Sequence, residues 1–295
     1  MIIVTGDRGF IGSELKQYLI AQGKTVHSMD WADRGRTWTA TEPIEWIYHM
    51  GAISETNVFD WDQLVRKNVQ DTQDWIRFAE AQGCGITYAS SASVYGPWVG
   101  SPEWGPFQPQ HPYGVSKITI DMWCAEQDFT VPVQGVRFFN VYGRNEGHKV
   151  QPSPIRRYIE QAVTQRRLTV WQHEGRLGSR DFISVDDCIA GMMQLKDTKT
   201  SGVYNLGTGR QLTFHDIASE IQKRVGIANA QIMTVPMPDH VVKNYQWESL
   251  ANLNKLRSVL PGWNPQTVSA WLDENFDSLY NKIAKELLNG ETQSK

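Results

Sequence analysis

Apolar runs and amphipathic stretches alternate along the first half of the chain. Short, β-branched apolar runs predict buried strands at 1–5, 25–29, 44–52, 85–89 and 133–139. Helical spacing of apolar residues predicts helices between them, at about 11–23, 62–82 and from 113 onward. Strands that alternate with helices favour a parallel, doubly wound sheet, so the expected fold class is α/β.

The second half of the chain has a mixed pattern. Thr213 and Asp216 form a capping box that predicts the start of a helix, and Gly226 predicts its end. A last helix is predicted over 272–287, where leucine, isoleucine and phenylalanine recur at helical spacing. This part of the chain is therefore expected to be a smaller, mixed α/β region.

A glycine-rich turn follows the first predicted strand. Gly6, Gly9 and Gly12 connect that strand to the first predicted helix. Glycines at this spacing let the backbone turn tightly and approach a pyrophosphate, which binds at the N-terminus of the helix. The turn predicts a Rossmann-type domain that holds NAD or NADP.

The residues after the second predicted strand bear on the choice between these two cofactors. Asp30 ends that strand, where a carboxylate accepts hydrogen bonds from the ribose hydroxyls of NAD. Arg8, Arg34 and Arg36 are suited instead to the 2′-phosphate of NADP. The sequence leaves both cofactors open.

The segment between the second predicted strand and the next one is short. Only residues 31–45 separate Asp30 from Trp46, and a parallel crossover uses about a dozen residues or more. This segment cannot hold a helix, a strand and a second crossover. The third strand of the sheet is therefore predicted to be absent or vestigial, and the adenosine pocket to be open.

Tyr113 and Lys117 lie four residues apart on a predicted helix and so share one face. A free phenol has a pKa of about 10, and a nearby lysine together with the positive nicotinamide ring is expected to lower it. Ser91, with Ser93 behind it, follows a predicted strand and can hold a substrate oxygen beside the phenol. This set predicts removal of an alcohol proton while hydride leaves to the cofactor.

Further segments extend the pattern nearly to the end of the chain. They are His-Met-Gly-Ala at 49–52, Arg-Phe-Phe-Asn-Val-Tyr-Gly at 137–143, Arg-Asp-Phe-Ile-Ser-Val-Asp-Asp at 180–187 and Tyr-Asn-Leu-Gly-Thr-Gly at 204–209. With the glycine-rich turn and the Ser, Tyr and Lys set, they make the chain resemble the extended short-chain dehydrogenase/reductase family. Most members of that family act on nucleotide sugars.

The resemblance implies a domain organisation and partners. A Rossmann domain over 1–150 would carry NAD(P), and a region over 151–295 would bind a nucleotide-diphosphate sugar. Part of 180–210 is expected to pack back on the first domain. The family tendency to pair through helices implies a homodimer or a higher homo-oligomer.

The resemblance also assigns candidate residues to each ligand. Candidates for the cofactor are Gly6, Arg8, Gly9, Phe10, Ile11, Gly12, Asp30, Trp31, Arg34, Met50, Gly51, Ala52, Asn68, Lys117 and Val141. Candidates for the substrate are Ser91, Ser93, Asn140, Gln151, Trp171, Arg180 and Tyr245. Arg180 would hold the diphosphate; the alternative is an ion pair with Asp181 or Asp186.

Within the family, the chain is similar to the branch of ADP-glyceromanno-heptose 6-epimerases. Those enzymes use the lysine of a Gly-His-Lys run as a second acid/base, and here that run ends in Lys149. An epimerase returns hydride to the opposite face of its intermediate, so one acid/base for each face suits the reaction. The catalytic candidates are Ser91, Tyr113, Lys117 and Lys149; alternatively, Lys149 contacts a phosphate.

The hypothesis is therefore a nucleotide-sugar epimerase that acts by transient oxidation and re-reduction, of the heptose 6-epimerase type. One alternative is a 4-epimerase acting on a UDP-hexose, and another is a non-catalytic NAD(P)-binding protein. A 4,6-dehydratase is disfavoured, because the Asp-Glu pair of those enzymes is absent from 91–93.

Composition excludes several other classes of protein. The net charge is −3 with interspersed charges, which gives no nucleic-acid footprint. The three cysteines are far apart, so neither structural zinc nor a disulfide framework is expected, and Asp186-Asp187 has no partner at metal-ligand spacing. The chain has no apolar run long enough for a membrane span and no basic segment before its first apolar run. We expect a cytoplasmic protein with no metal and no membrane partner.

Overall fold

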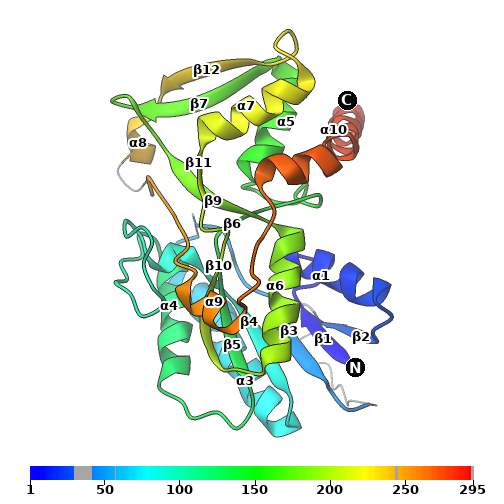
Figure 1. The fold of residues 1–295 in the computed structure, drawn as a ribbon, viewed down its shortest axis with the longest axis vertical. Coiled ribbons are helices and arrows are strands. Elements are labelled where there is room, and N and C mark those ends of the chain that lie inside the picture. The colour runs from blue at the N-terminus through cyan, green and yellow to red at the C-terminus, as the bar shows by residue number, and fades with distance from the viewer. Residues whose placement is uncertain (30–41, 57, 243–244, 294–295) are drawn as a thin grey trace. The chain divides into compact units, whose positions relative to one another are not determined.

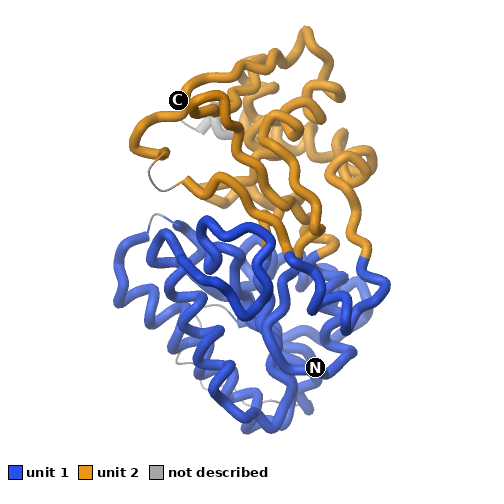
Figure 2. Tube along the Cα trace, turned by 60° about the vertical axis from the view of Figure 1, so that its left-hand side comes forward, with its two compact units in different colours: residues 1–138, 188–206, 252–263 blue, residues 139–187, 207–251, 264–295 orange. Residues whose placement is uncertain are grey.

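The computed structural model describes residues 1–29, 42–56, 58–242 and 245–293 (Figure 1). The chain divides into two compact units, each built from three segments (Figure 2). Unit 1 comprises 1–138, 188–206 and 252–263, and unit 2 comprises 139–187, 207–251 and 264–295. The division is thus not a single cut near residue 150.

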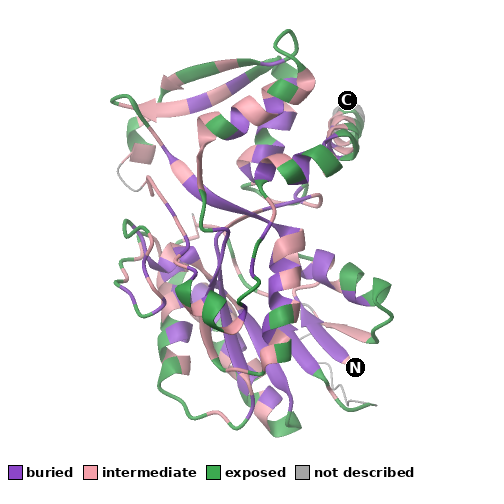
Figure 3. Ribbon diagram, viewed as in Figure 1, coloured by how far each residue is buried: buried purple, intermediate pink, exposed green. Residues whose placement is uncertain are grey.

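Unit 1 contains a six-stranded parallel sheet with the order β10-β5-β4-β3-β1-β2. Its strands are β1 (Ile2–Thr5), β2 (Val26–Met29), β3 (Trp46–His49), β4 (Gly85–Ser91), β5 (Val133–Phe138) and β10 (Gly202–Leu206). Every residue of β1, β3 and β5 is buried, as the purple strands in Figure 3 show. Burial of both faces explains why these strands are continuous apolar runs in the sequence.

The helices of unit 1 connect these strands. They are α1 (Phe10–Ala21), α2 (Trp61–Leu64), the π-helix η2 (Val65–Gln70), α3 (Asp71–Gln82), the 3₁₀-helix η3 (Ala92–Val94), α4 (Pro112–Ala125) and α9 (Asn254–Val259). Helix α6 (Val185–Thr198) begins in unit 2 and continues into unit 1.

Helices pack on both faces of the sheet. Ile47 of β3 belongs to one buried cluster with Ile76 of α3 and Ile120 of α4. The next residue, Tyr48, points to the opposite face, where its hydroxyl donates to the sulfur of Met193 in α6 at 3.6 Å. The parallel sheet is thus doubly wound, as predicted.

The expectation of a missing third strand concerns a segment that is only partly described. Among the described residues, the strand after β2 is β3, and it pairs with β1 on the side away from β2. Residues 30–41 lie outside the described residues. Asp30, Trp31, Arg34 and Arg36 are among them, so their expected roles at the adenosine end stay predictions.

A buried ion pair links α4 to the sheet of unit 1. Asp121 and Arg137 are each 2% exposed, and Arg137 Nε donates to Asp121 Oδ2 at 2.8 Å. The same carboxylate accepts from the hydroxyls of Tyr88 (3.0 Å) and Ser90 (2.8 Å). Arg137 Nη1 also donates to the Tyr95 hydroxyl at 2.7 Å. These bonds satisfy two charges that burial alone would strongly disfavour.

Unit 2 contains two three-stranded sheets. The sheet β11-β9-β6 consists of β6 (Asn140–Tyr142), β9 (Ser179–Ser184) and β11 (Gln211–Thr213). The sheet β12-β7-β8 consists of β7 (Arg167–His173), β8 (Arg176–Leu177) and β12 (Gln231–Pro236). The helices are α5 (Pro154–Gln165), α7 (Phe214–Val225), α8 (Asp239–Val242) and α10 (Val268–Gln293).

Three helices of unit 2 share one core. Ile159 of α5, Ile221 of α7 and Leu272 of α10 are fully buried in the same cluster. The predicted capping box is present at the start of α7, where Thr213 Oγ1 accepts from the Asp216 N–H and the Asp216 carboxylate accepts from the Thr213 N–H. In the described part of the chain, no helix is long and apolar enough to cross a membrane.

Candidate active site

The glycine-rich turn of unit 1 brings three backbone segments into contact. Gly6 has a φ of +66°, and a Cβ there would lie 2.5 Å from the Gly51 nitrogen. A Cβ on Gly12 would lie 2.2 Å from the Gly6 carbonyl oxygen. Only glycine fits at either position, so the turn, the start of α1 and the segment after β3 form one close-packed cradle.

Thr5 at the end of β1 holds the segment after β3 in place. Its hydroxyl bonds to His49 Nδ1 at 2.7 Å and accepts from the Gly51 N–H at 3.3 Å. The Met50 N–H donates to the Thr5 carbonyl at 3.2 Å. Met50, Gly51 and Ala52, expected at the cofactor, thus follow β3 beside the glycine-rich turn.

Asn68 has a structural role that the sequence did not indicate. Its amide is fully buried in the π-helix η2 and exchanges hydrogen bonds with the backbone of Ile53, at 2.8 and 3.0 Å. It also donates to the Ser116 hydroxyl in α4 at 3.0 Å. The side chain thus ties the segment after β3 to α4, and its expected contact with the cofactor stays a prediction.

Ser91, Tyr113 and Lys117 come together in unit 1. Ser91 ends β4, and its hydroxyl hydrogen-bonds the Tyr113 phenol. Lys117 is 2% exposed, lies 5.9 Å from the centre of the Tyr113 ring and donates to the Ala89 carbonyl at 2.7 Å. The His111 ring caps the start of α4 by accepting from the Gly114 N–H at 3.1 Å, which fixes the turn of helix that carries Tyr113.

The pKa of Tyr113 moves opposite to the direction expected from its lysine neighbour. Burial raises it to about 12, although the hydrogen bond from Ser91 acts to lower it. Burial also lowers the pKa of Lys117 to about 8, against the opposing effect of Asp121. Asp121 and Glu55 also act to raise the pKa of Tyr113, so the protein groups alone do not supply the expected lowering.

Ser93 has an unusual environment beside these groups. Its backbone N–H donates to Ser91 Oγ at 3.2 Å. Its own hydroxyl oxygen is buried and has no hydrogen-bond partner among the described residues. A buried hydroxyl without a hydrogen-bond partner lowers the stability of the fold by about 1–3 kcal/mol. Ser93 is therefore suited to form a hydrogen bond with a hydroxyl of a ligand.

Arg180 in unit 2 is a buried cation without a carboxylate partner among the described residues. It is 7% exposed, and its guanidinium lies 5.1 Å from the Tyr245 ring and 5.6 Å from the Phe214 ring. Burial lowers its pKa. The structure rejects the alternative pairings, because Asp181 accepts from Thr208, Gly209 and Ala251, and Asp186 pairs with Arg144. Its Nη1 donates to the Ser179 carbonyl at 2.9 Å, and a buried guanidinium that pairs with no carboxylate among the described residues is suited to an anionic ligand.

The other substrate candidates of unit 2 differ in how they are engaged. Asn140 is held by protein groups, since its amide donates to the Asp181 carbonyl (3.1 Å) and the Ser249 hydroxyl (2.9 Å). Trp171 lies in β7 under the Arg157 guanidinium at 5.8 Å, and Gln151 is exposed. Val141, a cofactor candidate, lies in β6 and pairs with Ile183 of β9.

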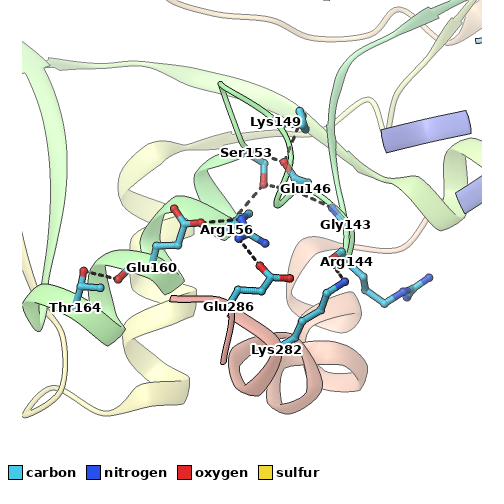
Figure 4. A network of polar contacts seen from close by, with 10 residues as sticks. All are labelled: Gly143, Arg144, Glu146, Lys149, Ser153, Arg156, Glu160, Thr164, Lys282 and Glu286. Atoms are coloured by element: carbon cyan, nitrogen blue, oxygen red, sulfur yellow. Dashed lines mark hydrogen bonds and ion pairs between the residues drawn. The ribbon is translucent and has the colours of Figure 1, made fainter. Parts of the chain in front are cut away.

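Lys149 lies in the loop between β6 and α5 (Figure 4). Its side chain is 27% exposed, and its Nζ lies 3.3 Å from Glu146 Oε2. Lys149 belongs to unit 2 and Tyr113 to unit 1.

Comparisons with known proteins agree with this arrangement. The model of the NAD dependent epimerase/dehydratase family matches residues 2–207. The chain belongs to this family. A curated relative, the ADP-L-glycero-D-manno-heptose-6-epimerase of Alkalilimnicola ehrlichii, is 31% identical over 88% of this chain and 91% of its own length.

Solved structures of similar proteins show the same fold. The ADP-L-glycero-D-manno-heptose-6-epimerase of Helicobacter pylori superposes with a TM-score of 0.81 at 20% identity, covering 95% of this chain and 96% of that one. The UDP-glucose 4-epimerase of Thermotoga maritima superposes with a TM-score of 0.78 at 19% identity, covering 97% and 99%. The Rossmann-type sheet with a smaller mixed α/β region is thus confirmed.

The cradle in unit 1 fits the NAD of the epimerase/dehydratase family. Gly9 at the N-cap of α1 gives no side-chain cap, and the first turn of α1 has no acidic residue. No acidic side chain in the first turn therefore opposes the binding of a pyrophosphate at the positive end of the helix dipole. Among the described residues no group of three His, Cys, Asp or Glu side chains could hold a metal ion.

Gly12→Ala is expected to weaken NAD binding by about 100-fold, or roughly 2.7 kcal/mol. The added Cβ would lie 2.2 Å from the Gly6 carbonyl, so the turn has to open. Isothermal titration with NAD measures the effect. Gly262→Ala is the control, since its Cβ would meet nothing within 4 Å. Unchanged affinity in Gly12→Ala would show that this turn does not hold the pyrophosphate.

Lys117→Met is expected to stabilise the fold at pH 7. Burial lowers the pKa of Lys117 from 10.5 to about 8, so its charge disfavours the folded state by about 3 kcal/mol at most. The variant also loses the hydrogen bond from Lys117 Nζ to the Ala89 carbonyl, which reduces this gain in stability by about 1 kcal/mol.

Between pH 8 and about 10.5 the folded chain binds fewer protons than the unfolded chain, because only the unfolded lysine is still charged. The cost of burying the Lys117 charge is therefore complete below pH 8 and disappears as the pH rises through that window. The thermal midpoint of Lys117→Met should exceed that of the wild type at pH 7, and the difference should shrink toward pH 10. Lys16→Met, which removes a half-buried lysine paired with Asp7, is the control. A lower midpoint at pH 7 would contradict the argument.

Two features of the candidate site were missed by sequence reasoning. The ion pair of Asp121 with Arg137 packs behind Lys117, but two charged residues in separate elements gave no signal of pairing. Glu146 was missed because a charged loop residue is normally exposed. Only its position three residues before Lys149 was available as a hint.

Proposed function

We propose that the protein is an NAD-dependent nucleotide-sugar epimerase that inverts C6 of ADP-glycero-manno-heptose. The observation that carries the epimerase chemistry is the contact of Ser91, Tyr113 and Lys117 in unit 1. The substrate is inferred from the 31% identical relative, whose name gives that activity.

Each residue of this group has a distinct role in the proposal. Tyr113 accepts the proton of the hydroxyl on the carbon to be inverted, and Ser91 holds the same oxygen by a hydrogen bond. Lys117 places its ammonium 5.9 Å from the centre of the Tyr113 ring and helps to position that ring. Bound NAD would supply the hydride acceptor and donor for that carbon, and its positive charge would favour the Tyr113 phenolate.

Substrate binding is assigned to a buried cation, a buried hydroxyl and several further residues. Arg180 is a buried guanidinium suited to the diphosphate, and Tyr245 stacks beside it. Ser93 has a buried hydroxyl oxygen with no partner among the described residues, which suits a sugar hydroxyl. Asn140, Gln151 and Trp171 complete the proposed set.

Lys149 is the proposed second acid/base. Inversion requires that the oxidised intermediate turn the opposite face of its carbonyl toward the cofactor. A proton must then be given to the carbonyl oxygen in this second orientation. Tyr113 serves one orientation of the substrate and Lys149 the other. Lys149→Met should therefore lower kcat by orders of magnitude, whereas a lysine that only contacts phosphate would mainly raise KM.

The decisive experiment follows by NMR the configuration at C6 of the heptose and at C4 of the hexose. The protein is incubated with ADP-D-glycero-D-manno-heptose, with UDP-glucose as a second substrate and Tyr113→Phe as the inactive control. Conversion of the heptose to its C6 epimer supports the proposal. Turnover of UDP-glucose alone would assign a 4-epimerase, and no conversion of either above the control would overturn the epimerase assignment.

The cofactor, the cellular location and the oligomeric state of the enzyme are also proposed. Asp30 favours NAD and Arg34 favours NADP, so the two cofactors are titrated separately. A cytoplasmic location suits the three free cysteines, and a heptose product would serve lipopolysaccharide synthesis. A homodimer or higher homo-oligomer is proposed from the family tendency, and sedimentation equilibrium tests it.

A further inference from the structure

The loop that carries Lys149 is organised around one carboxylate. Glu146 turns inward from this loop and is 1% exposed. It accepts hydrogen bonds from the N–H of Gly143 at 3.1 Å, the N–H of Ser153 at 2.6 Å and the hydroxyl of Ser153 at 2.7 Å. Gly143 follows β6 and Ser153 caps α5, so one side chain ties the two ends of the loop together (Figure 4).

Lys149 is a further donor to the same carboxylate. Its Nζ lies 3.3 Å from Glu146 Oε2, and its backbone N–H donates to the Glu146 carbonyl at 3.0 Å. The donors from Gly143 and Ser153 are neutral, whereas Lys149 brings a positive charge. Hydrogen bonds and an opposite charge both stabilise a buried carboxylate. The lysine in turn loses rotamer freedom, which fixes its amine at one place.

The neighbouring cations are engaged with other partners. Arg156 of α5 donates to Glu160 at 2.7 Å and to Glu286 of α10 at 2.6 Å. Lys282 of α10 donates to the carbonyl of Arg144 at 3.1 Å. These contacts brace the loop from the side of α10, and among the described residues the cation paired with Glu146 is Lys149 (Figure 4).

We propose that Glu146 is a positioning residue for the reaction, because it fixes the Lys149 amine in place and anchors the loop that presents it. The inference rests on the proposed function, in which Lys149 is the second acid/base. Glu146 itself is too deeply buried to reach a substrate, so its effect acts through Lys149.

The pairing is tested first by a measurement that needs no enzyme activity. Native protein is trace-labelled with acetic anhydride, and the acetylation of each lysine is read by peptide mass spectrometry relative to Lys16. Glu146→Gln releases the amine, so labelling of Lys149 should rise at least about threefold. Ser153→Ala removes one bond to the carboxylate but keeps the ion pair, and it should leave labelling unchanged. Unchanged labelling of Lys149 in Glu146→Gln would overturn the inference.

A double-mutant cycle tests the catalytic part. Glu146→Gln should lower kcat about tenfold or more and change KM by less than about threefold. In a Lys149→Met background it should cause no further loss, because the group it positions is gone. Equal losses in both backgrounds would mean that Glu146 acts only on structure, and this would refute the inference.

The two proposals fail in different ways. If Lys149→Met leaves kcat unchanged, the second acid/base of the proposed function is wrong, whatever the labelling shows. If Lys149→Met lowers kcat but Glu146→Gln does not, only the positioning role is wrong. Glu146→Asp keeps the charge but shortens the side chain by one methylene group. Its kcat is expected to lie between those of the wild type and Glu146→Gln, and it tests the same role if Glu146→Gln folds poorly.

Discussion

Tyr113→Phe should lower the kcat of epimerisation about 10³-fold while leaving NAD affinity unchanged. A positioned general acid/base contributes typically 10²–10⁴-fold, and the phenol oxygen is the group that exchanges the proton. The phenylalanine ring keeps the stacking on His111, at 5.8 Å between ring centres, and the contact with Lys117. The loss should therefore appear in kcat and not in the thermal midpoint.

The measurement is single-turnover kinetics with NMR detection, beside a titration with NAD. Tyr18→Phe is the matched control, because Tyr18 is 39% exposed on α1. The control should keep full activity. A loss below tenfold for Tyr113→Phe would show that another group transfers the proton, and the roles given to Ser91 and Lys117 would then need revision.

Asp121→Asn should destabilise the fold by about 3–5 kcal/mol, because it leaves the Arg137 guanidinium buried without its charge partner. Both residues are 2% exposed, so water cannot replace the lost interaction. The amide also presents an N–H₂ group to donors from Tyr88, Ser90 or Arg137. We expect the thermal midpoint to fall by roughly 10 °C.

An exposed ion pair provides the control for this prediction. Asp74 and Arg77 on α3 lie 3.4 Å apart with both side chains 60% exposed, and Asp74→Asn should change stability by less than about 1 kcal/mol. Replacing Asp121 and Arg137 together by leucines should recover much of the loss, since no charge then remains buried. A small effect of Asp121→Asn alone would mean that Arg137 is stabilised by Tyr95 and the aromatic rings around it.

Local patterns predicted most of the helices and strands. The capping box at Thr213 and the apolar runs at 1–5 and 133–139 depend on neighbours in the sequence, so their elements were correctly placed. The glycines at 6 and 12 likewise reflect close backbone contacts that the sequence motif encodes. The predicted strand at 44–52 was too long, because β3 ends at His49, where Thr5 turns the following segment aside.

Features that depend on distant residues could not be predicted. Asn68 is adjacent to Ile53 and Ser116 only in the folded chain, so its structural role was not visible. The direction of the Tyr113 pKa depends on burial, which no single motif reports. Segment 252–263 of unit 1 carries no boundary signal in its composition, whereas the resemblance had implied that part of 180–210 packs on the first domain.

The distribution of unit 1 over three segments has a consequence for synthesis on the ribosome. Strand β10 pairs with β5 at the end of the parallel sheet, yet 63 residues separate Phe138 from Gly202. Until β10 emerges, the hydrogen-bonding edge of β5 is exposed, and such edges pair readily with other chains. A nascent chain that ends near residue 150 therefore displays an open strand, so truncation at that point should give an aggregation-prone fragment. The N-terminal half of the sequence carries the cofactor motif, but its sheet is completed only by later residues.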